Sequence, residues 1–243
     1  MIPALTERAF RLMAAVPVPG SIVEFGVYQG SGLRTMGQRA RATLGEVPPL
    51  YGFDTFCGMP STNQPLQAFV SDYWAPGTFA DTSVDGVRDL LAADGLDATL
   101  VAARFDELRP LSEYGIDTVR LAHIDADLYE SYRDALRLLT PHIRVGSVLL
   151  FDESVPPTDP LTQSVRDHGQ KAVREWEETS GFNLHLIRFE WTVALCVLVD
   201  DEYLRRHWRV IDDLRKDTIQ ESLKNIVRRV ARRPREVRPG YAR

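Results

Sequence analysis

The sequence predicts an α/β protein whose mostly parallel sheet is covered by helices on both faces. Short segments that are apolar almost throughout alternate with longer segments of helical periodicity. Such uninterrupted apolar segments are typical of parallel strands buried on both faces. Near the end of the chain, two apolar segments flank a turn that is too short for a helical crossover, which predicts an antiparallel hairpin.

The predicted elements follow from apolar spacing and from the residues that end each segment. Seven strands are expected, over residues 21–25, 50–54, 98–102, 118–124, 146–151, 184–189 and 192–199. Helices are expected where apolar residues recur every three or four positions and glycine or proline follows, over residues 1–18, 31–44, 82–94, 129–139 and 164–179. We therefore expect one domain over residues 1–200.

Residues 55–80 form the longest predicted loop. They contain three prolines and two glycines and show no clean period. Long loops in compact domains are commonly lids or binding segments, so we expect this one to close over a ligand. Its aromatic side chains either stack on that ligand or pack the loop onto the body; they are Phe56, Tyr73, Trp74 and Phe79.

Charge divides the chain unevenly. Residues 1–200 hold 16 basic and 27 acidic side chains, whereas residues 201–243 hold 13 basic and seven acidic ones. In the second range, apolar residues at helical spacing predict an amphipathic helix or a pair of helices over 202–233, followed by a flexible basic tail. The apolar stripe of this helix docks either on the domain or on a second subunit, so a homodimer is one expectation.

Composition excludes several classes of protein. An acidic body argues against a nucleic-acid binder, because phosphate binding needs concentrated basic side chains. Cys57 and Cys196 make neither a disulfide framework nor a zinc spacing, which favours the reducing cytoplasm. No apolar run approaches the ~20 residues of a membrane span, and residues 1–18 lack the features of a signal peptide, so we expect no membrane partner.

Acids and glycines stand where the predicted strands end, which is where open α/β sheets bind ligands. They are Glu24 and Gly26, Asp54, Asp106, Asp125, and Asp152 with Glu153. After the first strand, the glycines of Gly26–Gly32 stand four and then two positions apart, unlike the Gly-x-Gly-x-x-Gly pattern of dinucleotide sites. This segment is either a structural turn or a site for a positively charged group. Asp54 either holds a ribose or caps a turn.

Three carboxylates are expected to converge at the ends of the fourth and fifth strands. Asp125 ends one, and Asp152 with Glu153 ends its neighbour, about 5 Å away. Carboxylates this close repel one another unless a cation lies among them, and oxygen ligands suit Mg²⁺. The alternative is a set of helix caps, and for Asp127 capping is the favoured role. His123 lies on a predicted buried strand and is expected to be a core histidine rather than a catalytic one.

Four segments resemble the macrocin O-methyltransferase family: residues 23–32, 51–60, 77–91 and 123–152. The most specific match is Ile124-Asp125-Ala126-Asp127-Leu128-Tyr129-Glu130-Ser131. These are class I enzymes with a Rossmann-like fold that transfer a methyl group from S-adenosylmethionine to sugar hydroxyls of natural products. The resemblance covers residues 20–199. One departure is Glu153, where the family usually has Asp, so its reach to a metal is open.

The resemblance implies a role for each strand-end residue. Glu24, Gly26, Gly30 and Ser31 would surround the methionine part of the cofactor, Asp54 would hold its ribose, and Asp125, Asp152 and Glu153 would hold Mg²⁺. Asp106 follows the predicted strand over residues 98–102, and for this reason we also assign it to the cofactor site. Asp125 is the candidate general base, with Asp127 and His123 as weaker ones.

Three functions are therefore compared. The leading one is an O-methyltransferase acting on a saccharide, and a catechol-like phenolic acceptor is the alternative. An oxidoreductase that binds a nicotinamide dinucleotide is disfavoured by the glycine spacing. A binding protein with a decayed fold is disfavoured because each strand end keeps a suitable residue type.

Overall fold

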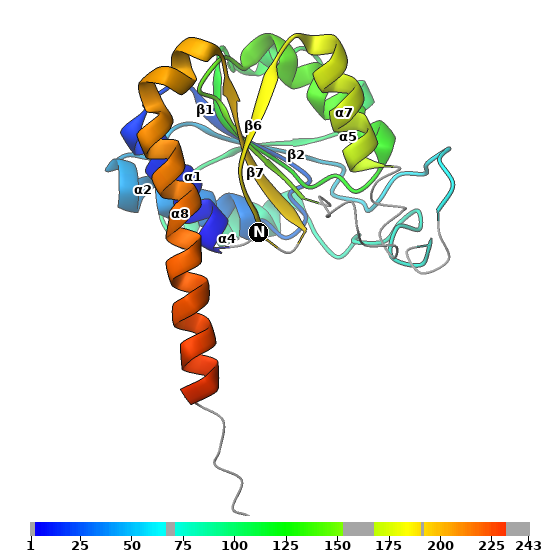
Figure 1. The fold of residues 1–243 in the computed structure, drawn as a ribbon. Helices are drawn as coiled ribbons and strands as arrows, with labels where there is room; N and C mark the ends of the chain where they lie inside the picture. Colours follow the sequence, from blue (N-terminus) through cyan, green and yellow to red (C-terminus); the bar gives the residue numbers. More distant parts are fainter. Residues whose placement is uncertain (1–2, 67–70, 153–167, 191, 232–243) are drawn as a thin grey trace, which may run out of the picture.

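The computed structural model describes the backbone of residues 3–66, 71–152, 168–190 and 192–231, and side chains within these ranges from residue 4 to 216. Its centre is one seven-stranded sheet in the order β3-β2-β1-β4-β5-β7-β6 (Figure 1). The strands are β1 (Ser21–Phe25), β2 (Leu50–Asp54), β3 (Thr99–Ala102), β4 (Val119–Ile124), β5 (Val148–Phe151), β6 (Asn183–Glu190) and β7 (Val193–Val199). The pairs from β3 to β5 are parallel, and β7 is antiparallel to both of its neighbours. The predicted sheet and its hairpin are confirmed.

Helices cover both faces of the sheet, as predicted. The helices are α1 (Pro3–Ala15), α2 (Ser31–Leu44), α4 (Val84–Ala92), α5 (Tyr129–Leu139), α7 (Gly169–Ser180) and α8 (Asp201–Ala231). Residues of α1, α2, α4 and α8 share one apolar core, and residues of α5 and α7 share the other (Figure 1). Three short 3₁₀ turns also lie in the chain, at Phe105–Glu107, Leu111–Tyr114 and Thr140–His142.

Strand β1 shows why an apolar segment becomes a central strand. Its side chains alternate between the two cores, with Ile22 on the α1–α2 face and Val23 and Phe25 on the α5–α7 face. All five of its residues are buried. Glu24 is the exception to its apolar character, because this carboxyl group is buried as well.

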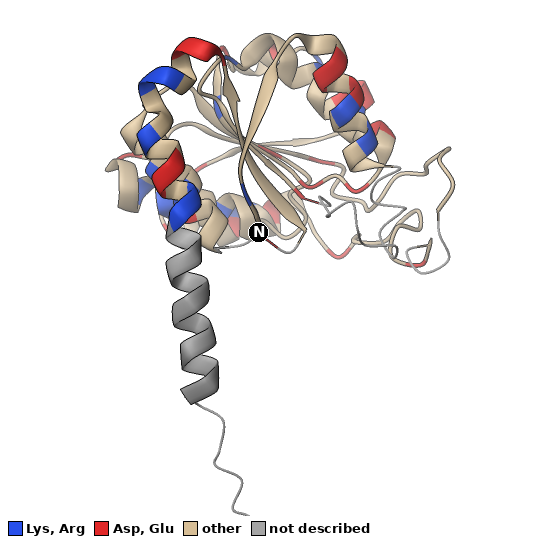
Figure 2. Cartoon of the chain, in the orientation of Figure 1, with Lys and Arg blue, Asp and Glu red and all other residues tan. Residues whose placement is uncertain are grey.

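The start of α8 is part of the α1–α2 core. Tyr203, Ile211 and Leu214 are buried there, whereas Trp208 is 47% exposed. Residues 201–216 carry five basic and four acidic side chains, so the basic excess of the chain end lies beyond them (Figure 2). Leu223 and the other apolar residues further along the predicted stripe lie outside the described side chains. The homodimer stays a prediction.

Two further observations bear on the class of protein. Among the described residues, no helix has the length and apolar character needed to cross a bilayer. Cys57 is exposed and Cys196 is buried, and both are free thiols. Burial raises the pKa of the Cys196 thiol to about 12, so this side chain is an unreactive part of the core.

Candidate active site

A cleft of about 310 Å³ opens at the carboxyl ends of the parallel strands. It lies beside β1 and β4, the neighbours at which the order of the strands reverses direction, where α/β sheets bind ligands. Six of the residues that line it are acidic and one, Arg104, is basic. The acidic ones are Asp54, Asp106, Asp125, Asp127, Glu130 and Asp134. The cleft therefore favours a cationic ligand.

Gly26 closes the turn after β1 at the rim of this cleft. Its φ is +88°, and a Cβ added there would lie 1.8 Å from the carbonyl oxygen of Asp125. The amide of Asp125 in turn donates to the carbonyl of Phe25 at 2.9 Å. Only glycine allows this approach, so the turn after β1 and the end of β4 are held together without side chains between them.

Asp54 organises two loops with its two carboxylate oxygens. Oδ2 accepts the backbone N–H groups of Val27 and Tyr28, both at 2.8 Å, and Oδ1 accepts that of Phe56 at 2.8 Å. The side chain also lines the cleft. The interpretation as a turn cap is therefore correct, and a contact to a ribose stays a prediction that the position of Asp54 allows.

The other predicted cofactor residues divide into two groups. Asp106 lines the cleft and pairs with Arg104 at 3.0 Å, which lowers the pKa of this carboxyl and keeps it ionised. Gly30 packs against α4, where an added Cβ would lie 2.7 Å from a methyl group of Val87. Neither Gly30, Ser31 nor Glu24 is among the residues that line the cleft. Their assignment to the cofactor stays a prediction.

Glu24 lies below the cleft, in the α1–α2 core. It is the parallel-sheet neighbour of His123, and its Oε1 lies 2.7 Å from Nδ1 of the imidazole. Each of the two residues is 1% exposed. The carboxylate also lies against the first turn of α2, where a Cβ added at Gly32 would be 1.9 Å from Oε1. His123 is thus a buried histidine, as expected, but one with an acidic partner.

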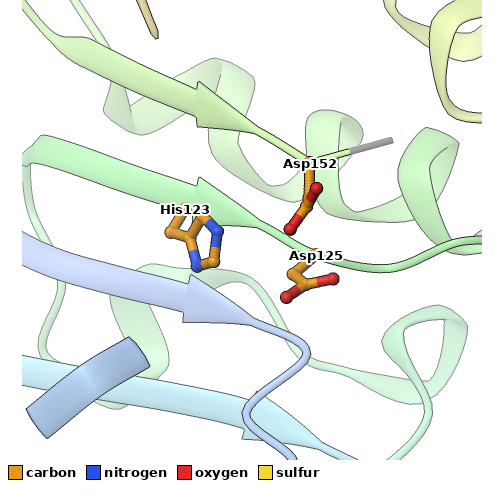
Figure 3. A group of neighbouring side chains, drawn as sticks. All are labelled: His123, Asp125 and Asp152. Carbon is orange, nitrogen blue, oxygen red and sulfur yellow. The ribbon is translucent and has the colours of Figure 1, made fainter. Parts of the chain in front are cut away.

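His123, Asp125 and Asp152 come together at the ends of β4 and β5 (Figure 3). Each offers one ligand atom, and the three atoms lie within 4.8 Å of one another. Two opposed ligands of an ion at about 2.1 Å lie about 4.2 Å apart, so these donors would have to close in by about 0.6 Å at most to bind one small divalent cation. Glu153, the third predicted ligand, lies outside the described residues, so the set of three carboxylates stays a prediction.

The environment of this group changes the pKa of two of its members. Burial, followed by the charges of Asp152, Asp127 and Glu24, raises the pKa of Asp125 to about 7, and His123 opposes the rise. Burial acts to lower the pKa of His123, but the hydrogen bond and charge of Glu24, with Asp125 and Asp152, outweigh it and raise the pKa. The acids thus repel one another in the absence of a cation.

Neighbouring groups hold Asp152 in place. Its Oδ1 accepts the hydroxyl of Thr192 on the turn between β6 and β7, at 2.8 Å. Its backbone carbonyl lies 2.7 Å from the hydroxyl of Tyr132, which also lies 2.9 Å from the carbonyl of Ile124. Tyr132 is fully buried, so one phenol joins the ends of β4 and β5.

The loop of residues 55–80 forms one wall of the cleft, and α5 holds it there. Six of the lining residues belong to it. Glu130 in the first turn of α5 accepts the hydroxyl of Thr62 at 2.8 Å and the amide of Asn63 at 3.1 Å. The two arms of the loop join through backbone hydrogen bonds between Met59 and the Gly77–Thr78 segment. The described part of the loop thus lines the cleft, and its closure over a ligand stays a prediction.

The aromatic residues of this loop have different roles. Phe79 lines the cleft and Tyr73 is 69% exposed. Phe56 packs on the α1–α2 core, and buried Trp74 lies edge-on to the ring of His168 at 5.2 Å. Stacking on a ligand therefore remains open for Phe79, and the packing interpretation holds for Phe56 and Trp74.

The prediction that Asp127 caps α5 was wrong. The N-cap position is Leu128, whose own side chain makes no capping hydrogen bond, and the amide of Tyr129 donates instead to Nδ1 of His168 at 3.1 Å. Asp127 instead has a left-handed backbone, with φ of +54°, and lines the cleft. Tyr28 and Phe79 have positive φ as well and also line it. Non-glycine residues in this region are strained by about 1–3 kcal/mol each, and such strain often gathers at functional sites.

Sequence reasoning missed several residues of the cleft wall, Glu130 among them, and it also missed His168, which contacts the start of α5. Glu130 stands within the most specific motif, yet nothing in its spacing shows that it binds a loop 68 residues away. His168 is fully buried, and its Nδ1 accepts the amide of Tyr129 at 3.1 Å. Only the fold brings these partners together.

Comparison with known proteins agrees with this geometry. Three solved structures share the fold. The O-methyltransferase NovP is 22% identical, with a TM-score of 0.66 over 80% of this chain and 78% of that one. The calicheamicin methyltransferase CalS11 is 24% identical, with a TM-score of 0.58 over 79% of this chain and 76% of that one, and an O-methyltransferase from Bacillus cereus in complex with SAH is 12% identical, with a TM-score of 0.52 over 81% of this chain and 82% of that one. No curated protein sequence is significantly similar. The family model for macrocin-O-methyltransferase (TylF) matches residues 5–194. The chain therefore belongs to the macrocin-O-methyltransferase family, whose members are O-methyl-transferring enzymes.

Proposed function

We propose that this chain transfers a methyl group from S-adenosylmethionine to a hydroxyl of a sugar or glycosylated natural product, with the assistance of Mg²⁺. The observation that carries the proposal is the acidic cleft at the ends of β1 and β4 in a chain of this family. S-adenosylmethionine is a sulfonium cation whose methyl group is the electrophile. The six acids of the cleft favour this cation and disfavour the anionic pyrophosphate of a nicotinamide dinucleotide.

The residues of the cleft have separate tasks in this proposal. Gly26, Asp54 and Asp106 bind the methyl donor at the ends of β1, β2 and β3. Asp125 and Asp152, with the predicted ligand Glu153, hold the divalent ion. When bound, such an ion lowers the pKa of a hydroxyl group and fixes its direction.

Methyl transfer is an in-line displacement in which a C–O bond forms as the C–S bond breaks. Positioning of the two reactants supplies much of the rate, which is the task of the cleft walls and of the loop held by Glu130. The hydroxyl proton goes to Asp125, which lines the cleft.

The structural neighbour CalS11 is a TDP-rhamnose 3′-O-methyltransferase of calicheamicin biosynthesis. A saccharide acceptor and a role in antibiotic biosynthesis are therefore part of our proposal for this chain. We also keep the cytoplasm as its proposed location.

Ligand binding and methyl transfer test the proposal together. S-adenosylhomocysteine should raise the Tm of the purified protein, whereas NAD and NADP should not, because a ligand that binds only the folded state stabilises it. Radiolabelled methyl transfer from S-adenosylmethionine should then be measured with TDP-rhamnose and with catechol as acceptors. Transfer to catechol alone would favour the phenolic alternative, and stabilisation by NAD alone would contradict the proposal.

Substitution of the strand-end acids separates chemistry from donor binding. Asp125→Asn and Asp152→Asn should abolish transfer and leave the affinity for S-adenosylhomocysteine within a few-fold of the original. Asp97→Asn, at an exposed position, is the matched control. Full activity in the presence of EDTA would contradict the part played by Mg²⁺.

A further inference from the structure

The buried pair of Glu24 and His123 has two polar atoms whose role the proposed function leaves unexplained. Among the described residues, Oε2 of Glu24 and Nε2 of His123 find no hydrogen-bond partner, although both are buried. A buried polar atom without a partner costs about 1–3 kcal/mol. Native proteins bury few such atoms, and those that persist commonly have a ligand or a catalytic role.

The imidazole is the more informative half of the pair. Its Nδ1 lies 2.7 Å from Oε1 of Glu24, and a carboxylate at this distance holds a hydrogen on Nδ1. With its hydrogen on Nδ1, a neutral imidazole has a lone pair on Nε2. That nitrogen is then a donor for a metal ion.

The carboxylates of Asp125 and Asp152 lie next to this ring. One ring nitrogen of His123 and one carboxylate oxygen of each acid lie within 4.8 Å of one another, and Figure 3 shows the ring and the two carboxylates at adjacent strand ends. A carboxylate that hydrogen-bonds the far nitrogen of a metal-binding histidine is a recurrent arrangement, because it fixes the tautomer and the direction of the ring. The 2.7 Å between Oε1 of Glu24 and Nδ1 of His123 is the hydrogen-bond distance that this arrangement requires.

We propose that His123 binds the divalent ion through Nε2, beside Asp125 and Asp152, and that Glu24 is a positioning residue that orients the imidazole. This inference rests on the ion of the proposed function and changes its ligand set from oxygen alone to oxygen and nitrogen. Imidazole is a poorer ligand for Mg²⁺ than for Mn²⁺ or Co²⁺. The site should therefore bind Mn²⁺ more tightly than Mg²⁺ by about tenfold or more.

Burial of the pair gives the proposal a structural reason. Each member is 1% exposed, and the carboxylate lies against the backbone of α2 at Gly32. The imidazole is thereby fixed before an ion arrives. Such preorganisation keeps the ligand nitrogen near one geometry without a loss of side-chain entropy on binding.

Pulsed electron paramagnetic resonance of the full chain loaded with Mn²⁺ tests the ligand directly. The expected spectrum has a ¹⁴N coupling to the ion, and selective ¹⁵N labelling of histidine changes it. The coupling should be absent in His123→Gln and present in His207→Gln, whose histidine contacts Tyr203 on α8. Bound Mn²⁺ without a nitrogen coupling in the unsubstituted protein would overturn the proposal and leave an all-oxygen ion site intact. No Mn²⁺ binding at all would overturn both.

The role of Glu24 is tested by Glu24→Gln. We expect Mn²⁺ affinity to fall by about 10–100-fold, with the nitrogen coupling retained but its quadrupole splitting changed, because that splitting reports on the hydrogen bond at the remote nitrogen. A fold that remains intact by circular dichroism, together with unchanged Mn²⁺ affinity and splitting, would remove Glu24 from the metal site. Binding of S-adenosylhomocysteine, measured on the same samples, separates failure of this inference from failure of the proposed methyltransferase.

Discussion

The carboxylate of Glu130 accepts the hydroxyl of Thr62 at 2.8 Å, across 68 residues of sequence. One side chain of α5 thus holds the loop that walls the cleft, and the backbone N–H of Asn63 adds a second hydrogen bond to the same carboxylate. Burial acts to raise the pKa of Glu130, but a hydrogen bond from its own backbone N–H, together with those from Thr62 and Asn63 and the charge of His168, outweighs it and keeps the pKa below its usual value. The carboxylate of Glu130 that holds the loop is therefore charged at neutral pH.

Glu130→Gln should loosen this loop. Hydrogen bonds to a charged acceptor contribute about 1.5–3 kcal/mol, and an amide keeps only one acceptor oxygen. We expect faster proteolysis within residues 55–80 and a KM for S-adenosylmethionine that is raised about tenfold, at unchanged global stability. Glu113→Gln, which alters an exposed pair with Arg109, is the control. Equal proteolysis of the two variants would show that Glu130 does not hold the loop.

Asp54→Asn should disturb the loops after β1 and β2. The carboxylate accepts three backbone N–H groups with its two oxygens, and an amide must turn its NH₂ group toward at least one of them. Each donor left without an acceptor costs about 1–3 kcal/mol. We expect affinity for S-adenosylhomocysteine to fall more than tenfold, by isothermal titration calorimetry. Unchanged affinity together with a lower Tm would restrict Asp54 to a structural role.

Stability without a metal should depend on pH through Asp125. Its pKa is about 7 in the folded protein and near 3.8 ordinarily, so the folded state binds more protons than the unfolded state between these values. Stability therefore falls as pH rises through this window, and Asp125 alone contributes at most about 1.4 kcal/mol per pH unit. His123, whose pKa is also raised, adds a fall in the same direction.

Urea denaturation in EDTA between pH 5 and pH 8 measures this dependence. Asp125→Asn should flatten the profile, and Mn²⁺ should restore stability most strongly at the alkaline end, where its ligands are deprotonated. A profile that is the same for the original protein and the variant would show that Asp125 is not the titrating group.

Gly32→Ala should be destabilising although it lies in a helix. Alanine ordinarily stabilises a helix by about 0.5–1 kcal/mol relative to glycine. Here the new Cβ would lie 1.9 Å from the buried Oε1 of Glu24, which is held by His123, so we expect a loss of about 1–3 kcal/mol.

Gly86→Ala in α4 is the matched control. Its Cβ would meet only the hydroxyl of Ser83, at 3.1 Å. The free energies of unfolding of the two variants can be compared by urea titration. A Gly32→Ala protein that is as stable as the control would show that the pair of Glu24 and His123 can rearrange freely.

The sequence predicted the sheet well because its signals are local. Apolar runs such as Ser21–Phe25 end in glycine or an acid, and Ser83 caps α4 through its hydroxyl, as its place before the helix indicates. The prediction for Asp127 failed because capping depends on the backbone at one position, and that residue is held in a left-handed conformation.

The arrangement of the site depended on long-range packing. The convergence of Asp125 and Asp152 could be predicted, because parallel strands end at one edge. The partnership of Glu24 with His123 could not, because it requires knowing that β1 and β4 are neighbours in this register. The hold of Glu130 on Thr62 depends on the path of an irregular loop, for which the sequence has no periodic signal.

The loop supplies Thr55, Gly58, Met59, Pro60, Ser61 and Phe79 to the cleft, so a third of the enclosing surface residues belong to a segment without helix or strand at those positions. In the proposed reaction, exchange of bound molecules with solvent would depend on any movement of that segment. If the segment had to move in every cycle, departure of the product, rather than methyl transfer, would limit turnover. Substitutions at Glu130 or Trp74, which pack the loop onto the body, would then change the turnover rate without altering the residues proposed to bind the methyl donor and the ion.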